Sequence, residues 1–172
     1  MAQTEQKNQN VKKQFEELQS LLERAMALQT SMVLFEWDDE TLAPKGAAEH
    51  TARVIGSLSE QYQEIMASMR FKELLDVCQK AEKENAGVFD EVQSAILREA
   101  AEEQERLSCI PPEEYRKYSE LTSEGTRVWT EAKEKKDFDR FAPFLEEIIS
   151  YQKKFASYQA KEGQSIYNVM LD

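Results

Sequence analysis

Apolar residues recur at helical spacing through almost the whole chain, and this feature most constrains how it can fold. In the first segment they follow steps of three and four residues with one gap: Val11, Phe15, Leu18, Leu22, Ala25, Met32 and Phe35. Such steps place side chains on one stripe of an α-helix. Gly and Pro contribute only 5 and 4 of 172 residues, which leaves little material for turns. The pattern predicts an all-α fold and excludes an all-β fold.

The stripes, and the residues that interrupt them, predict a bundle of about six long antiparallel helices. The first helix should run from Val11 to near Trp37, where two Asp residues and then Pro44 interrupt it. Asp90 and Gln93 have the spacing of a capping box, and Pro143 is expected in the first turn of the last long helix. The second helix is expected over 48–69, and the third from 71 to a stop at 85–87. The fourth should run from 90 to about 107, the fifth from 112 to a turn at 136–139, and the last from a first turn that contains Pro143 to 163. The resulting domains are a polar N-terminal tail (1–10), one helical domain (11–163) and the start of a truncated following element (164–172).

The charge balance restricts the partners. Lys and Arg number 22 against 33 Asp and Glu, a net charge of −11, which repels nucleic-acid phosphates and anionic lipid surfaces. The first ten residues lack the apolar core of a signal peptide, and no apolar run approaches the roughly 18 residues that span a bilayer. Cys78 and Cys109 suit two reduced, buried thiols. We therefore expect a cytoplasmic protein that binds neither nucleic acid nor membrane.

The residues offer little catalytic chemistry by themselves. A catalytic zinc site usually takes two or three His ligands, and His50 is the one His in the sequence. We therefore expect no metal-binding and no catalytic residue here, and we interpret His50 as a solvent-facing or hydrogen-bonded residue. Asp38, Asp39 and Glu40 stand together, but nothing indicates two carboxylates in different environments. We prefer the interpretation that Asp39 or Thr41 caps the next helix.

Three blocks resemble, in order, the carboxypeptidase Taq family of metallocarboxypeptidases. Trp37-Asp38-Asp39-Glu40-Thr41-Leu42-Ala43-Pro44, with Arg53 beyond it, resembles that family's Trp-Asp-x-x-Thr-x-Met-Pro segment and following Arg. The stretch from Leu107 to Pro112, then Trp129, Asp137-Phe138, Phe141, Pro143 and Leu145 resembles its Trp…Asp-Phe-x-x-Phe-x-Pro-x-Leu block. The final block, 167–172, resembles Tyr-Asp-x-Leu-Leu-Asp. The chain departs from these patterns at Ala43, Asn168 and Met170.

The resemblance implies an N-terminal helical part that forms one wall or lid of a deep groove, so that only peptide C-termini reach the metal. In that family the His-Glu-x-x-His zinc helix, the later Glu ligand and the substrate-binding residues lie downstream of the third block, so none of them carries over. The resemblance also suggests residues that shape the groove or form the seam with the missing half. These candidates are Trp37, Asp38, Thr41, Pro44, Arg53, Trp129, Phe138, Phe141 and Pro143.

Our first interpretation is therefore the helical lid of a zinc-type metallocarboxypeptidase that releases C-terminal amino acids from peptides. Its partners would be the missing catalytic part and peptide substrates, and zinc or another divalent metal would belong to the full-length protein. We expect the isolated chain to be inactive. The alternative is a complete, non-enzymatic helical protein, derived from a peptidase, that binds a partner or forms a homodimer. A third, less favoured interpretation is the lid of a helical oligopeptidase. The reading frame after codon 172 discriminates the first two.

Overall fold

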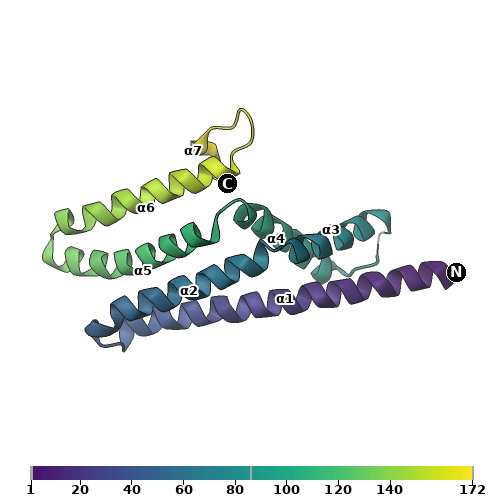
Figure 1. Ribbon diagram of the computed structural model, residues 1–172, viewed down its shortest axis with the longest axis horizontal. Coiled ribbons are helices and arrows are strands. Elements are labelled where there is room, and N and C mark those ends of the chain that lie inside the picture. The colour runs from purple at the N-terminus through teal and green to yellow at the C-terminus, as the bar shows by residue number, and fades with distance from the viewer. Residues whose placement is uncertain (1, 86, 172) are drawn as a thin grey trace. The chain divides into compact units, whose positions relative to one another are not determined.

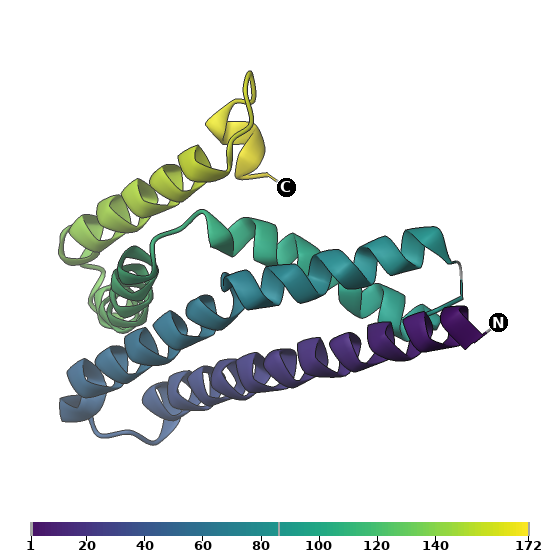
Figure 2. The same ribbon diagram turned by 45° about the vertical axis from the view of Figure 1, so that its right-hand side comes forward.

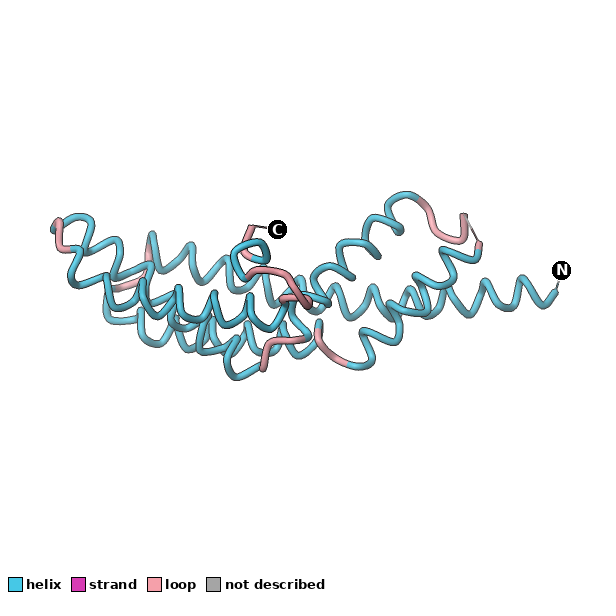
Figure 3. Tube along the Cα trace, turned by 90° about the horizontal axis from the view of Figure 1, so that it is seen from above, coloured by secondary structure: helices cyan, strands magenta, loops and turns pink. Residues whose placement is uncertain are grey.

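The computed structural model describes residues 2–85 and 87–171, and it describes side chains from Gln6 onward apart from that of Lys45. All regular elements in this part of the chain are helices (Figures 1 and 3), so the predicted all-α class is confirmed. The elements, in chain order, are α1 (Ala2–Thr41), the short 3-10 helix η1 (Lys45–Ala47), α2 (Ala48–Met66), α3 (Met69–Glu84), α4 (Glu91–Ser108), α5 (Pro112–Lys135), α6 (Phe138–Gln159) and α7 (Ile166–Val169). None of the described helices is long and apolar enough to cross a membrane.

The helices form two compact units, where the sequence pattern led us to expect one helical domain over 11–163. Unit 1 consists of the chain up to Ala27 together with Tyr62–Ser108. Unit 2 consists of Leu28–Gln61 together with the chain from Cys109 onward. α1 and α2 each contribute residues to both units.

The core of unit 1 brings together the first part of α1 with α3 and α4. The first part of the predicted stripe of α1 is confirmed here, because Phe15 and Leu18 are buried and the ring of Phe15 packs on Phe89 with centroids 5.0 Å apart. The stripe fails at its far end, where Phe35 is 40% exposed. An ion pair links α3 to α1, with Arg70 Nε 2.8 Å from Glu17 Oε1 and Arg70 Nη2 2.6 Å from Glu17 Oε2. The other buried side chains in this core include Phe71, Leu74, Leu75, Cys78, Leu97 and Leu107.

Unit 2 contains the antiparallel pair α5 and α6, and α2 runs beside the last part of α1 (Figures 1 and 2). Tyr118 of α5 packs edge-on against Phe155 of α6, with ring centroids 5.3 Å apart. A Cβ at Gly125 of α5 would lie 3.2 Å from Ile148 Cδ1, so glycine lets the two helices approach closely there. Ala52 and Ile55 of α2 are also buried.

Several predicted features of single helices are confirmed. The backbone N–H of Gln93 donates to Asp90 Oδ1 at 2.8 Å, and that of Asp90 donates to Gln93 Oε1 at 3.0 Å, which is the reciprocal capping box. Pro112 stands at the start of α5, where the missing N–H costs no hydrogen bond. Neither Cys78 nor Cys109 forms a disulfide; Cys78 is buried and Cys109 is partly buried.

The boundaries of α1 differ from the prediction. The helix begins at Ala2, so the stretch that we expected as a polar tail continues it, and it ends at Thr41 instead of near Trp37. Gln, Lys and Glu are good helix formers whether or not they face a core, so the absence of an apolar stripe in the first ten residues did not mark a helix end. Asp38 and Asp39 likewise do not stop a helix, and the chain leaves it only before Pro44.

Three further expectations about the helices were wrong. Met69 belongs to α3, because Ser68 ends the preceding turn and its Oγ accepts from Phe71 N at 3.1 Å. α6 begins at Phe138 after the cap Asp137 and ends at Gln159, so Pro143 lies inside the helix and the helix stops before Gly163. The helical period in 90–107 also places Val92 on an inward stripe with Ile96 and Ala100, but Val92 is 68% exposed. The buried residues of α4 are Leu97, Ala100, Gln104 and Leu107.

Candidate functional site

The predicted groove and seam residues all belong to unit 2, where they occupy separate stretches of four helices. Trp37, Asp38 and Thr41 lie in the last two turns of α1, and Pro44 precedes η1. Arg53 lies on α2 and Trp129 on α5. The other three, Phe138, Phe141 and Pro143, lie on α6.

The last turns of α1 hold their residues by local hydrogen bonds. Thr41 Oγ1 donates to the carbonyl of Trp37 at 2.6 Å, and the N–H groups of Leu42 and Ala43 donate to the carbonyl of Asp38 at 2.9 and 2.8 Å. The expectation that Asp39 or Thr41 caps the next helix was wrong, because both residues are still inside α1. Pro44 precedes η1 in extended conformation, with no side-chain cap. The indole of Trp37 is 57% exposed.

Two residues of the resemblance form an aromatic pair between α5 and α6. The rings of Trp129 and Phe141 have centroids 5.2 Å apart, and Lys133 Nζ lies 5.9 Å from the Trp129 ring. Phe138, one turn before Phe141, is 59% exposed, and Pro143 is also exposed. Of the predicted set, the structure thus brings Trp129 and Phe141 into contact.

Arg53 has a local role in this structure. Its Nη1 lies 2.7 Å from Glu49 Oε1, one turn earlier on α2, and both side chains are exposed. A pair at this spacing supports the helix by a few tenths of a kcal/mol. Any further role of Arg53 at a seam stays a prediction.

A polar groove lies within unit 2 between the end of α1 and the middle of α5. One cavity of about 350 Å³ and an adjoining cavity of about 190 Å³ share Asp39, Glu40 and Thr126. Glu36 lines the smaller cavity from α1. From α5, the smaller cavity is lined by Thr122, Ser123 and Thr126, and the larger one by Thr126, Arg127, Thr130, Glu131 and Glu134. This face of α5 was not among the predicted residues, although the four-residue spacing of Thr122, Thr126 and Thr130 indicates a polar stripe.

Ion pairs beside the larger cavity hold α6 against α5. Arg127 Nη1 lies 2.9 Å from Glu131 Oε1, and Arg140 Nη2 of α6 lies 2.6 Å from Glu131 Oε2. Burial acts to raise the pKa of Glu131, but the guanidinium groups of Arg140 and Arg127 outweigh it and hold that pKa below the ordinary value. The pKa of Glu36 shifts the other way, because burial and then the negative charge of Glu40 both raise it.

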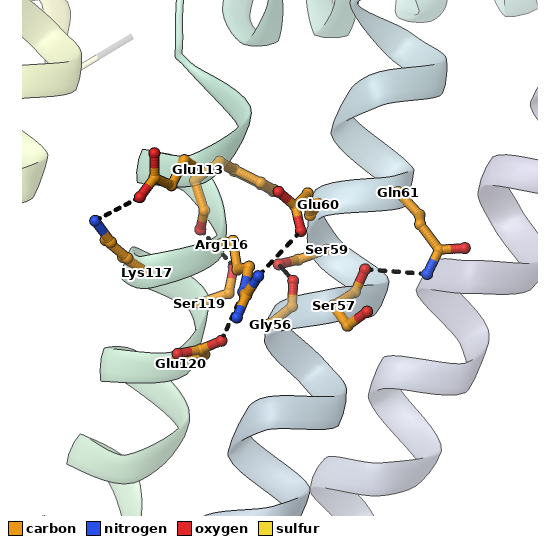
Figure 4. Close-up of polar contacts among 11 residues, drawn as sticks. Gly56, Ser57, Ser59, Glu60, Gln61, Glu113, Arg116, Lys117, Ser119 and Glu120 are labelled. Carbon is orange, nitrogen blue, oxygen red and sulfur yellow. Dashed lines mark hydrogen bonds and ion pairs between the residues drawn. The ribbon is translucent and has the colours of Figure 1, made fainter.

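A second ionic cluster positions α5 against α2, as Figure 4 shows. Arg116 Nε lies 2.9 Å from Glu120 Oε1 on its own helix, and Arg116 Nη1 lies 3.5 Å from Glu60 Oε2 on α2. The side chain of Glu120 passes directly over Gly56 of α2, where Ser59 Oγ donates to the Gly56 carbonyl at 2.9 Å. Gly56 on α2 and the ionic cluster of Arg116, Glu120 and Glu60 therefore set how closely α2 and α5 approach each other.

The described residues do not fit a resident metal ion. His50 lies exposed in the first turn of α2, and no three His, Cys, Asp or Glu side chains in the described part of the chain are grouped to hold a metal. We therefore assign no chemical step through a metal to these residues.

A comparison with protein families decides the relationship. The model of the Carboxypeptidase Taq (M32) metallopeptidase family matches residues 17–172. This chain belongs to that family. Carboxypeptidase 1 of Bacillus subtilis is 36% identical to it over 152 residues, a span of 88% of this chain but 29% of the relative.

Two solved structures share this fold. The crystal structure of BsuCP matches 93% of this chain with a TM-score of 0.85 at 34% identity, and the structure of Pyrococcus furiosus carboxypeptidase matches 92% with a TM-score of 0.67 at 30% identity. The match covers 31% of each of those chains. This chain therefore spans about three-tenths of the length of these proteins.

Proposed function

We propose that this chain is the N-terminal helical part of an M32 metallocarboxypeptidase, and that it forms one wall or lid of the groove through which peptide C-termini reach the metal. The observation that carries the proposal is the match to BsuCP, which spans 93% of this chain but 31% of that protein. The helices thus fold like one part of a larger peptidase. The reaction would be the release of C-terminal amino acids from peptides, with zinc or another divalent metal held by the rest of the protein.

The exposed side chains of unit 2 support a role as a wall against another part of the protein. Trp37 and Phe138 are 57% and 59% exposed, and Leu42, just after α1, is 73% exposed. A contiguous patch of exposed apolar side chains marks a surface that a partner covers, and we propose that these three residues contribute to such a patch. We propose that these residues, with Asp38, Thr41, Pro44, Arg53, Trp129, Phe141 and Pro143, face the seam or the groove, and that residues 164–172 lead into the next element.

The same proposal implies that the isolated chain has no peptidase activity, because its single His cannot supply the two or three His ligands of a catalytic zinc site. It also places the protein in the cytoplasm, in keeping with two cysteines that form no disulfide, one of them deeply buried.

The direct test is a peptidase assay of the purified chain. With zinc or cobalt added, we expect no release of C-terminal amino acids from N-blocked peptides, as followed by mass spectrometry. The matched control is His50→Ala, since any turnover that this variant retains comes from a contaminating peptidase. Turnover that survives repurification and is lost in His50→Ala would overturn the proposal.

The reading frame beyond codon 172 separates the proposal from the non-enzymatic alternative. An in-frame continuation that encodes His-Glu-x-x-His supports the peptidase part. A native stop codon supports a binding or dimerisation protein that uses the exposed face of unit 2, and sedimentation of the chain would then show whether two copies pair.

A further inference from the structure

Residues 25–35 of α1 form the longest run without a charged residue in the whole sequence. The run makes about three turns of helix, although Asp, Glu, Lys and Arg together make up 32% of the chain. A helix on a protein surface usually turns charged side chains toward the water, whereas a helix with apolar side chains all round is buried. The run therefore indicates that α1 is covered on more than one side here.

The side of α1 that faces away from the groove carries an exposed apolar stripe in unit 2. Four side chains with i, i+3, i+4 and i+7 spacing share this face, and we call them the outer stripe: Thr30, Val33, Leu34 and Trp37. Val33, Leu34 and Trp37 are 57%, 60% and 57% exposed. Asp39, which lines both cavities beside α5, lies half a turn of helix away from Thr30. The outer stripe is therefore an apolar face separate from the groove.

Carboxylates stand at both edges of the outer stripe. Each lies one turn after a member of the stripe, Glu36 and Glu40 on one edge and Asp38 on the other. The chain has no Lys or Arg over 25–44, and none of the three carboxylates forms an ion pair with a described side chain. Arg127, which lines the larger cavity with Glu40, forms its ion pairs within α5. The edges of the stripe are therefore negative.

The charge of these edges decides between two kinds of partner. A second copy packed on the same face would bring like carboxylates together, and each chain already carries a net charge of −11. A helix whose apolar side chains are edged by Lys or Arg would complement both the apolar stripe and its negative edges. A stripe that is one helix face wide also suits packing against another helix.

We propose that the outer stripe docks an amphipathic helix whose apolar side chains are edged by Lys or Arg. The contact removes the stripe from water and places basic groups beside the three carboxylates. Interface cores are depleted in charged residues and enriched in Trp and Met, as residues 25–37 are. In the peptidase, this helix belongs to the part of the protein beyond this chain. That placement rests on the proposed function, whereas the chemistry of the contact does not.

Titration of the purified 172-residue chain with two synthetic helical peptides of equal length tests this inference. Both peptides lack Trp and carry the same stripe of Leu, and its edges are Lys in one and Glu in the other. In a Trp129→Phe background the Trp emission reports Trp37, and calorimetric titration of the wild type measures the affinity independently. We expect the Lys peptide to bind at least about tenfold more tightly, with a blue shift of the emission, and high salt to reduce this preference.

Paired variants show whether the outer stripe is the docking surface. Val33→Ser/Leu34→Ser should weaken binding of the Lys peptide by at least about tenfold, because it removes exposed apolar contact area. The matched control is Met69→Ser/Val92→Ser, which changes two equally exposed apolar side chains of unit 1 and should bind like the wild type. Circular dichroism of each variant checks that the helices remain.

A charge variant, Glu36→Gln/Glu40→Gln, should reduce the preference for the Lys peptide, and it provides the test if the Ser variant loses helicity. Equal affinity for the two peptides, or unchanged binding by Val33→Ser/Leu34→Ser, would overturn the inference. A dimer in sedimentation that this Ser variant dissociates would do so as well, because the occupant would then be a second copy. All of these results leave the proposed peptidase role intact, since the assay and the reading frame test that role.

Discussion

Gly56 of α2 lies so close to Glu120 of α5 that a Cβ at Gly56 would come within 2.6 Å of Glu120 Oε1. Because Arg116 holds Glu120 in place at 2.9 Å, that side chain cannot move aside without weakening the ion pair. We therefore expect Gly56→Ala to destabilise the chain by about 1 kcal/mol, even though alanine is the better helix former. Urea unfolding followed by circular dichroism measures this change.

Two matched variants show whether the contact with Glu120 is the cause. Gly46→Ala should be neutral or stabilising, because no atom lies within 4 Å of the added Cβ. In a Glu120→Ala background, Gly56→Ala should stabilise the chain by up to about 1 kcal/mol. The same loss of stability in both backgrounds would contradict this account.

The capping box before α4 gives a prediction for unit 1. Asp90→Ala removes the acceptor of the Gln93 N–H and should cost about 1 kcal/mol of unfolding free energy. Asp90→Asn should retain most of that stability, because asparagine caps about as well. Glu99→Ala, on the exposed face of α4, is the control and should change the stability by less than about 0.5 kcal/mol. A variant Asp90→Ala that is as stable as the control would rule out the cap as a contributor.

The ion pair between Arg70 and Glu17 predicts a pH dependence. The hydrogen bond from Arg70 lowers the pKa of Glu17 below its ordinary value. Since the pKa is lower in the folded state, the pair contributes stability above the unfolded-state pKa and loses it as the pH falls through the folded-state value. Arg70→Gln should therefore lower the urea midpoint at neutral pH and converge with the wild type in acid. High salt should also reduce the difference, and a gap that persists in acid would contradict the ionic explanation.

The two thiols should differ in reactivity. Burial raises the pKa of the Cys78 thiol to about 11, so near pH 8 only about one molecule in a thousand carries the thiolate. Cys109 is partly buried. A colorimetric thiol reagent should modify one equivalent in the native chain, at Cys109, and a second only after unfolding. Rapid modification of Cys78 in the native chain, identified by peptide mapping, would count against the buried core of unit 1.

Pro143 lies inside α6, where its missing N–H leaves the carbonyl four residues earlier without the usual helical hydrogen bond. Pro143→Ala should therefore stabilise the chain, by about 1 kcal/mol, as measured by thermal unfolding. Loss of stability would show instead that the ring packs in a way that alanine cannot replace. A gain in stability would mean that Pro143 does not contribute to the stability of these helices.

The parts of the fold that the sequence predicts well are those with local causes. The stripe through Phe15 and Leu18 follows from the 3.6-residue period, and the pair Asp90–Gln93 needs a separation of three residues alone. The end of α1 was misjudged because acidic residues weaken the end of a helix without forbidding it. Pro44 disfavours the helical conformation at the residue before it, and α1 ends at Thr41, shortly before that proline.

The candidate site was less predictable, because a groove depends on which helix faces come together. The resemblance named Trp129 and Phe141, which do pair, but it could not show that Thr126 of α5 would line a cavity with Glu40 of α1. Those residues are far apart in sequence, and their contact follows from the tertiary arrangement of unit 2. The division into two units was missed for the same reason, since no composition change marks it.

The 40-residue helix α1 and the helix α2 each supply part of both units. Melting either unit would therefore disrupt two helices that continue into the other unit. We therefore expect the whole chain to unfold in one cooperative transition, although it contains two compact units. In calorimetry, the calorimetric and van't Hoff enthalpies of unfolding should then be equal.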